Sequence, residues 1–250
     1  MAVVNTPKLL RGLLVALLLT AAGCGAKSAN APDVGSSANV RERNVSFNTS
    51  DGKRLTGRLF GSSTVGITLA HMYPADATSW YPVARKLAAA GYMALAFNFR
   101  GYADSDGPKT IPKTPFDIQA ARDYLRRNGA RDIVFIGASM GGTASIVAAQ
   151  TSDPIAVVAV SAPLRFLGLD AVPATTSVQR PVLLMAARDD PSGAFGALQQ
   201  FARDLPNPVT KVYAGDAHGT NLLSARPGAV DEIVQFLQRW APVNPATVKP

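Results

Sequence analysis

One serine occupies a pattern that could turn it into a nucleophile. Ser139 is the central residue of Gly-Ala-Ser-Met-Gly at residues 137–141, which follows the apolar run Ile133–Ile136 and precedes a helical pattern over residues 143–150. At a sharp turn from strand to helix, the central residue adopts a strained backbone conformation, so its neighbours must be small. The serine hydroxyl then projects beyond the end of the strand. The spacing therefore predicts an accessible, reactive serine at residue 139.

The base that such a serine requires has two candidates. A serine hydroxyl is a weak nucleophile until a neutral imidazole accepts its proton, and the chain contains only His71 and His218. His218 follows the strand-like run Lys211–Ala214, on a loop flanked by glycines. A histidine at that end of a strand could reach over Ser139, so His218 is the predicted general base.

An acid must hold the imidazole in the correct tautomer and stabilise its charged form. The run Val182–Ala187 ends in Arg-Asp-Asp-Pro, which places Asp189 and Asp190 between the serine and the histidine in chain order. Pro191 fixes the turn directly after Asp190, so Asp190 is the preferred partner of His218. Asp189 remains the alternative.

The elements that must position these side chains alternate between strands and helices. Continuous apolar runs are typical of parallel strands buried on both faces. They span residues 65–70, 92–97, 133–136, 155–160, 182–187 and 211–214. Helical patterns lie between them, and Ser79 is expected to cap the first helix.

The N-terminal strands differ from the rest. Residues 43–48 and 55–60 alternate apolar and polar side chains around Asp51-Gly52, a dipeptide typical of a hairpin turn. The sequence thus predicts an α/β fold with a doubly wound, mostly parallel sheet and an N-terminal antiparallel hairpin. Ligands of such folds bind at the carboxyl ends of the strands.

These motifs together resemble the α/β-hydrolases of the serine esterase and dienelactone hydrolase-like group, in which the order along the chain is also serine, acid, histidine. The resemblance covers residues 44–240 and implies the α/β-hydrolase fold. True dienelactone hydrolases have cysteine at the position of Ser139, the turn from strand to helix known as the nucleophile elbow. A serine there implies acyl transfer to water. The implied reaction is hydrolysis of an ester-like bond through a covalent acyl-enzyme, with no cofactor and no metal.

The family also carries His-Gly-x-Pro after its third strand, where the backbone helps to stabilise the oxyanion. The matching residues here are His-Met-Tyr-Pro at residues 71–74, with Met72 in place of the usual glycine. The resemblance implies that the backbone N–H groups of Tyr73 and Met140 form the oxyanion hole and that His71 is a structural residue bonded to backbone. Residues 98–107 resemble the family's Arg-Gly-x-Gly-x-Ser loop, which shapes the edge of the sheet.

The N-terminus reads as an export signal. Lys8 and Arg11 precede an apolar run that ends in small residues, the order found in secretory signals, and the uncharged stretch is shorter than the roughly 20 residues of a membrane-spanning helix. The ending Ala-Ala-Gly-Cys24 resembles the bacterial lipoprotein box, in which the cysteine is acylated. Cys24 is the only cysteine of the chain.

The expected organisation has four parts. They are a signal peptide over residues 1–23, a lipidated Cys24 with a flexible tether over residues 24–40, an α/β-hydrolase domain over residues 41–240, and a flexible tail over residues 241–250. This predicts a palmitate-bearing lipoprotein attached to a membrane of the bacterial cell envelope. A secreted protein cleaved near Ala22 is the alternative.

Composition excludes other classes of protein. With 47% hydrophobic and 17% charged residues, the chain is not intrinsically disordered, and its net charge of +8 comes from basic residues spread singly, without a stripe for nucleic acid. One cysteine and two histidines provide neither an internal disulfide nor a structural zinc site. The expected partners are a small acyl substrate and, through the lipid, a membrane. No nucleic acid is expected, and the sequence does not indicate an oligomeric state.

Two other functions remain open at this stage. A serine peptidase on the same fold would need a site for a peptide amine, and a binding lipoprotein would keep the fold without turnover. The related enzymes insert lids after the strand that matches residues 155–160. Here residues 161–181 are all that precede the next strand, and a parallel crossover alone needs about a dozen residues. We therefore expect an open site without a large lid, lined by Tyr73, Trp80 and Tyr102.

Overall fold

The computed structural model describes residues 40–243, which lie within one compact unit of the chain, Ser37–Pro250. The signal peptide, Cys24 with the tether as far as residue 39, and the tail beyond residue 243 lie outside the described residues. Among residues 40–243, no helix has the length and apolar character needed to cross a membrane.

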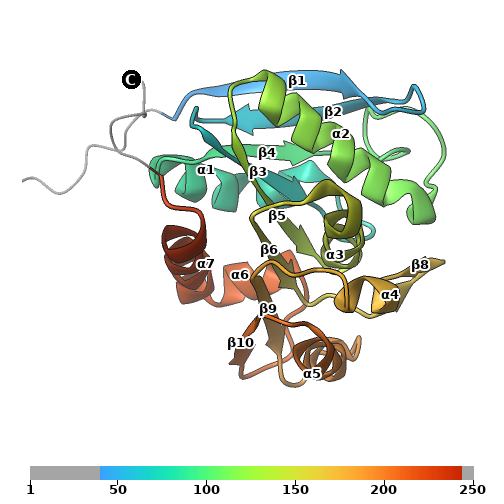
Figure 1. The fold of residues 1–250 in the computed structure, drawn as a ribbon, viewed down its shortest axis with the longest axis vertical. Helices are drawn as coiled ribbons and strands as arrows, with labels where there is room; N and C mark the ends of the chain where they lie inside the picture. Colours follow the sequence, from blue (N-terminus) through green and yellow to red (C-terminus); the bar gives the residue numbers. More distant parts are fainter. Residues whose placement is uncertain (1–39, 244–250) are drawn as a thin grey trace, which may run out of the picture. The chain divides into compact units, whose positions relative to one another are not determined.

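The centre of the fold is an eight-stranded sheet in the order β1-β2-β4-β3-β5-β6-β9-β10 (Figure 1). Its strands are β1 (Glu42–Asn48), β2 (Arg54–Phe60), β3 (Val65–Ala70), β4 (Met93–Phe97), β5 (Asp132–Ala138), β6 (Ala156–Val160), β9 (Val182–Ala187) and β10 (Pro208–Tyr213). The β1–β2 and β2–β4 pairs are antiparallel, and the other pairs are parallel. The predicted fold class, including the N-terminal hairpin, is confirmed.

The register brings the carboxyl ends of the parallel strands level with one another. Ala70 pairs with Gly137, and Ala138 pairs with Val160. In the outermost parallel pair, β9 and β10, the last residues also pair, Ala187 with Tyr213. The loops that follow β3, β5, β6, β9 and β10 therefore leave the same edge of the sheet, and these loops carry the predicted site residues.

Helices cover both faces of the sheet (Figure 1). They are α1 (Tyr81–Ala89), α2 (Thr114–Arg127), α3 (Met140–Ser152), α4 (Val172–Thr175), α5 (Ala194–Asp204), α6 (Thr220–Ala225) and α7 (Pro227–Trp240), with short 3-10 turns η1 (Ala77–Trp80) and η2 (Ile111–Lys113). Buried side chains of α2, α3 and α5 pack on one face, and those of α1, α6 and α7 pack on the other. Because alternate side chains of each strand enter opposite cores, apolar residues dominate β3, β4, β6 and β9.

The first helix begins differently from the expectation. The N-terminal cap belongs to η1 and is Asp76, whose carboxylate accepts the Thr78 backbone N–H at 2.8 Å. Ser79 instead donates its hydroxyl to the Asp76 carbonyl at 2.8 Å. A charged carboxylate is the stronger acceptor at the positive end of a helical turn, so Asp76 takes the position predicted for Ser79.

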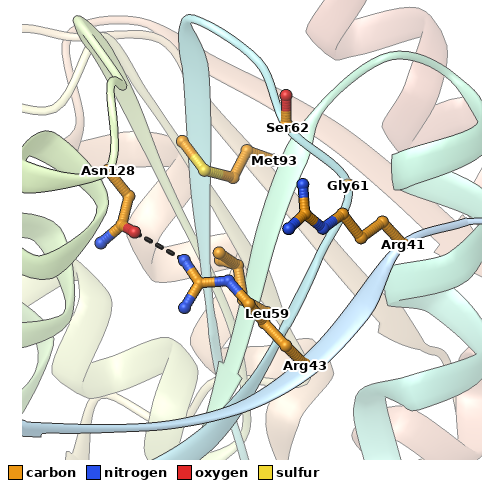
Figure 2. A pocket seen from close by; sticks show the side chains of 7 residues that line it. All are labelled: Arg41, Arg43, Leu59, Gly61, Ser62, Met93 and Asn128. Carbon is orange, nitrogen blue, oxygen red and sulfur yellow. Dashed lines mark hydrogen bonds between the residues drawn. The ribbon is translucent and has the colours of Figure 1, made fainter. Parts of the chain in front are cut away.

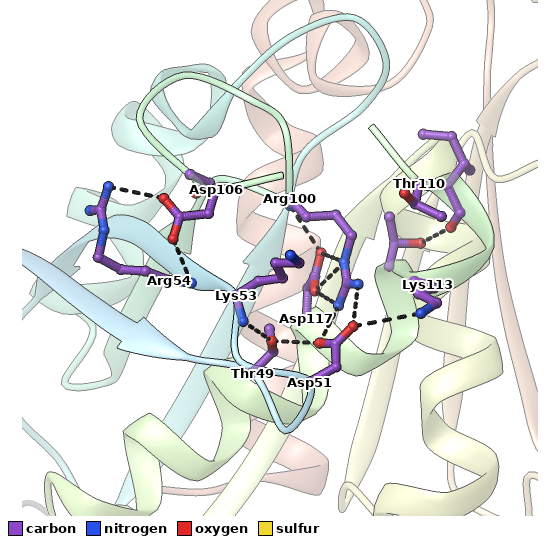
Figure 3. A network of polar contacts seen from close by, with 12 residues as sticks. Thr49, Asp51, Lys53, Arg54, Arg100, Asp106, Thr110, Lys113 and Asp117 are labelled. Carbon is purple, nitrogen blue, oxygen red and sulfur yellow. Dashed lines mark hydrogen bonds and ion pairs between the residues drawn. The ribbon is translucent and has the colours of Figure 1, made fainter. Parts of the chain in front are cut away.

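A buried ionic network fixes the loop after β4 (Figure 3). Arg100, at 2% exposure, donates to both carboxylate oxygens of the fully buried Asp117 at 2.6–3.2 Å. The same guanidinium donates to Asp51 in the β1–β2 turn at 2.8 and 3.1 Å. These bonds from Arg100 hold the pKa of Asp51 well below its usual range. One guanidinium thus joins the hairpin turn, the loop after β4 and the start of α2.

Between β6 and β9 the chain forms a small hairpin followed by α4. The hairpin consists of β7 (Arg165–Phe166) and β8 (Leu169–Asp170), and Leu167 at its tip is 64% exposed. Two strands of two residues each do not make a large lid, so the described part of the chain agrees with the expected absence of one. The hairpin itself was not predicted.

Candidate active site

Ser139 lies at a strained turn between β5 and α3. Its backbone has φ 49° and ψ −118°, in the region that residues other than glycine rarely adopt. A side chain at Gly137 would collide with the Gly141 carbonyl, and one at Gly141 would collide with the Ala70 carbonyl. The Ser139 backbone N–H donates to the Val160 carbonyl at 2.8 Å. The small residues that flank Ser139 are therefore required by close backbone contacts around a fixed turn.

His218 and Asp190 meet at the same edge of the sheet. The Nδ1 atom of His218 lies 2.7 Å from Oδ2 of Asp190, and the Asp190 side chain is fully buried while that of His218 is 28% exposed. The other carboxylate oxygen accepts the backbone N–H of Ser192 at 2.9 Å and its hydroxyl at 2.7 Å. The Asp190 carboxylate is therefore held on one side by Ser192 and on the other by His218.

The structure distinguishes the two adjacent aspartates. Asp189 is exposed, and its backbone N–H donates to the Gly215 carbonyl at 3.0 Å. Among residues 40–243, no hydrogen bond joins the Asp189 side chain to His218, whereas Asp190 makes that contact. The geometry therefore favours Asp190 as the acid that orients His218.

Met72 connects the loop after β3 to the loop that carries His218. Gly219 has φ +59°, and a side chain there would collide with the Met72 sulfur. The Thr220 hydroxyl lies 3.7 Å from the same sulfur. Met72 thus fills space against the residue after His218, and Gly219 provides the room for it.

Within the described residues, Ser139 and His218 do not form a hydrogen bond with each other. Hydrogen bonds between catalytic groups often tighten only when substrate binds.

His71 uses both ring nitrogens in backbone contacts. It is fully buried; its Nδ1 lies 3.0 Å from the Met72 carbonyl, and its Nε2 accepts the Phe99 backbone N–H at 3.2 Å. This pairing requires the proton on Nδ1. Burial lowers the pKa of His71 to about 4, so the ring is neutral near pH 7 and joins the loops after β3 and β4.

The two backbone groups expected in an oxyanion hole lie on different loops. Met140 is the first residue of α3, so its N–H has no partner within the helix. Within residues 40–243, neither this group nor the Tyr73 N–H donates a hydrogen bond. Both groups therefore remain available to an acceptor from a substrate.

Two aromatic side chains lie near Tyr73. Its ring, 46% exposed, lies 6.5 Å from Tyr102 and 5.7 Å from Phe166 of the hairpin, between ring centroids. The Tyr102 hydroxyl lies 3.8 Å from the Met140 sulfur, which connects this group to the elbow. Trp80, in contrast, is fully buried in the core. The expectation that it lines the site is therefore wrong.

Sequence reasoning missed Ser192 and Phe166. Ser192 follows Asp190 by two residues, and its backbone and side chain both bond the carboxylate, the pattern of an Asx turn. That spacing could have indicated the contact. Phe166 could not have been found in this way, because its position depends on a hairpin with very short strands.

In the described part of the chain, no cluster of three or more His, Cys, Asp or Glu side chains is placed to hold a metal ion.

The family model for the alpha/beta hydrolase fold matches residues 67–174, which run from β3 into α4. The chain has the α/β-hydrolase fold. The resemblance found in its motifs is thereby confirmed at the level of the fold, and Ser139 lies in this fold at the turn between β5 and α3. No curated protein matches the chain.

Several solved structures share this α/β-hydrolase fold. An esterase from Pyrococcus furiosus superposes with a TM-score of 0.72 at 23% identity, over 80% of this chain and 91% of its own. A dienelactone hydrolase from Anabaena variabilis gives 0.65 at 20% identity, over 80% and 96%. Est1E from Butyrivibrio proteoclasticus, in a structure with ferulic acid bound, gives 0.66 at 17% identity, over 78% and 98%.

Proposed function

We propose that the protein is a serine hydrolase that cleaves an ester-like acyl bond in a small molecule. Ser139 is the nucleophile, His218 is the general base, and Asp190 orients the imidazole. The observation that carries this proposal is the 2.7 Å contact between the buried Asp190 carboxylate and His218, at the edge of the sheet where Ser139 adopts its strained turn. The esterases among the structural neighbours support the same class of reaction.

The first half of the reaction forms an acyl-enzyme. Asp190 accepts the Nδ1–H of His218, which leaves the lone pair on Nε2 free to take the hydroxyl proton of Ser139. The Ser139 Oγ then attacks the substrate carbonyl carbon, and the N–H groups of Tyr73 and Met140 bind the resulting oxyanion. When the intermediate collapses, the bond to the leaving alcohol breaks, and the imidazolium of His218 returns its proton to that alcohol.

The second half releases the acid. A water molecule takes the place of the alcohol, and His218 removes its proton as the water oxygen attacks the acyl carbon. Collapse of this second intermediate breaks the bond to Ser139, and the proton returns from His218 to the serine oxygen. The carboxylic acid leaves, and the enzyme is restored to its starting state.

A fluorophosphonate probe tests the nucleophile directly. The experiment uses residues 25–250, because all described helices and strands lie within them, and measures labelling together with hydrolysis of an activated short ester. Ser139→Ala is expected to abolish both with little change in the thermal midpoint, whereas Ser224→Ala, on α6, is expected to retain both. Persistent labelling of Ser139→Ala would rule out Ser139 as the nucleophile.

We further propose that Cys24 is acylated and attaches the enzyme to a membrane of the bacterial cell envelope. The support is the order of charged, apolar and small residues before the single cysteine of the chain. Cys24→Ser is expected to lose metabolic labelling by palmitate and to leave the membrane fraction. A Cys24→Ser protein that stays labelled would exclude Cys24 as the lipid site.

A further inference from the structure

A hollow with a volume of about 380 Å³ lies at the amino ends of the parallel strands, the edge opposite to Ser139. It is bounded by the start of β1, the turn after β2, the start of β4 and the end of α2 (Figure 2). Its lining residues are Arg41, Arg43, Leu59, Gly61, Ser62, Met93 and Asn128. Two cations thus share one cavity that no carboxylate lines.

The alternation of side chains along β1 explains why Arg41 and Arg43 line the cavity while Glu42, between them, does not. Arg41 and Arg43 are two positions apart and face the same side of the strand, while Glu42 between them faces the other side. There the Glu42 carboxylate accepts from Arg85 at 2.6 Å and from Arg58 at 3.4 Å. The nearest carboxylate along the chain is therefore already neutralised on the opposite face of the sheet.

The guanidinium of Arg43 is held in place by neutral groups. It donates to the Tyr124 hydroxyl at 2.9 Å and to Asn128 Oδ1 at 2.6 Å. Neither Arg41 nor Arg43 has an ion-pair partner among residues 40–243. Figure 2 shows the Arg43 guanidinium pointing toward Asn128, with the Arg41 side chain lying apart from it, nearer to Gly61. Guanidinium groups bind phosphate oxygens through paired hydrogen bonds, so this hollow has the chemistry of a phosphate site.

The position of the hollow indicates the source of the phosphate. The described chain begins at Val40, directly before Arg41, and only residues 25–39 separate it from Cys24. Arg126 and Arg131, both exposed, lie close to Asn128 in sequence on the same edge of the fold. Of the residues that the structure describes, those at the start of β1 on this basic edge are therefore nearest in sequence to Cys24, the proposed lipid site. A lipid headgroup is thus the source of phosphate that this position favours.

We propose that the Arg41–Arg43 hollow binds the phosphate of an anionic lipid headgroup and docks this edge of the enzyme on the membrane. The proposal rests on the lipid anchor proposed for Cys24, which would keep the domain near such headgroups. Docking through the amino ends of the strands turns the opposite edge, with Ser139 and His218, toward the aqueous side. The enzyme would then take dissolved substrate while remaining bound to the lipid surface.

Vesicle binding by the unlipidated chain, residues 25–250, tests the hollow separately from the lipid. Co-sedimentation is measured with phosphatidylcholine vesicles with and without phosphatidylglycerol. Each arginine at an anionic surface contributes about a fivefold factor in binding, so Arg41→Gln with Arg43→Gln is expected to weaken binding to the anionic vesicles about 25-fold. Higher salt is expected to weaken binding of the wild type as well.

A matched variant separates the hollow from net charge. Arg54→Gln with Lys113→Gln removes the same charge from exposed side chains near the β1–β2 turn and is expected to bind like the wild type. An equal loss in both double variants would overturn the assignment to this hollow. Esterase activity on a soluble ester is expected to be unchanged in both.

Competition distinguishes the source of the phosphate. Inorganic phosphate at millimolar concentration is expected to leave vesicle binding largely intact, because several headgroups act together. Full displacement by inorganic phosphate, or equally tight binding to duplex DNA, would overturn the lipid assignment. Persistent palmitate labelling of Cys24→Ser would overturn the anchor alone, whereas the vesicle experiment uses the unlipidated chain, so the two proposals fail separately.

Discussion

The Nδ1 atom of His218 lies 2.7 Å from Oδ2 of Asp190, although the two residues are 28 positions apart. They meet because β9 and β10 are parallel neighbours that end level, with Ala187 beside Tyr213. Burial raises the pKa of Asp190, but the hydrogen bonds from Ser192 and His218 outweigh it, and the net pKa lies below its usual range. The carboxylate is therefore ionised wherever the imidazole is needed as a base.

Replacement of Asp190 by asparagine is expected to lower kcat by about four orders of magnitude, because the amide favours the wrong imidazole tautomer. Asp189→Asn is the matched control, and it is expected to change kcat little because its exposed side chain does not contact His218. Steady-state kinetics on a soluble ester measure both. A larger loss in Asp189→Asn than in Asp190→Asn would transfer the role to Asp189.

Replacement of Arg100 by alanine is expected to reduce the free energy of unfolding by about 3–5 kcal/mol, since it leaves the buried Asp117 carboxylate without its ionic partner. Lys113→Ala removes only an exposed partner of Asp51, 3.7 Å away, and is expected to cost less than about 1 kcal/mol. Urea unfolding measures both. Similar costs for the two variants would show that the buried network does not stabilise the fold.

Acid is expected to destabilise the protein through His71. Burial lowers its pKa from 6.5 to about 4, so between these values the unfolded chain binds a proton that the folded protein does not. Stability therefore falls as the pH drops through this window, by up to about 3 kcal/mol, and is unaffected by this group above it.

His71→Asn isolates that contribution, because asparagine does not titrate. The variant is expected to be less stable at pH 7, and the difference from the wild type is expected to shrink as the pH falls toward 4. Thermal unfolding across this range measures it. Parallel stability curves for the two proteins would show that His71 does not take part. Asp76 and Lys109, the charged groups near the ring, are kept in both proteins.

The bounds of the inner strands can be predicted from residue types alone, whereas those of an edge strand cannot. β3 and β9 were predicted at their observed bounds, because every residue of both strands is buried and apolar side chains dominate. β10 begins at Pro208, three residues before the expected start, since this edge strand carries the exposed Thr210 and Lys211. A search for continuous apolar runs does not find the full length of an edge strand in which no residue is fully buried.

Parts of the site could be predicted for similar reasons. The elbow at Ser139 depends on a local sequence of small residues, and His218 and Asp190 each follow a recognisable strand. The contact between Met72 and Gly219 joins segments far apart in sequence, and no local pattern indicates it. The carboxylate of Asp117, in the first turn of α2, binds Arg100 from the loop after β4, and no local pattern indicates this contact either.

The rate of ester hydrolysis is expected to follow dissolved substrate smoothly, with no jump when a short ester passes its solubility limit. Interfacial activation requires an apolar cover that moves on contact with lipid, whereas the segment between β6 and β9 supplies only the β7–β8 hairpin and α4. Long-chain triglycerides are accordingly expected to be poor substrates. Rates measured across the solubility limit for the wild type and for Leu167→Ser, at the exposed hairpin tip, test this directly. A sharp rise in the wild type that disappears in Leu167→Ser would show that the hairpin acts as a lid over Tyr73, whose ring Phe166 already contacts.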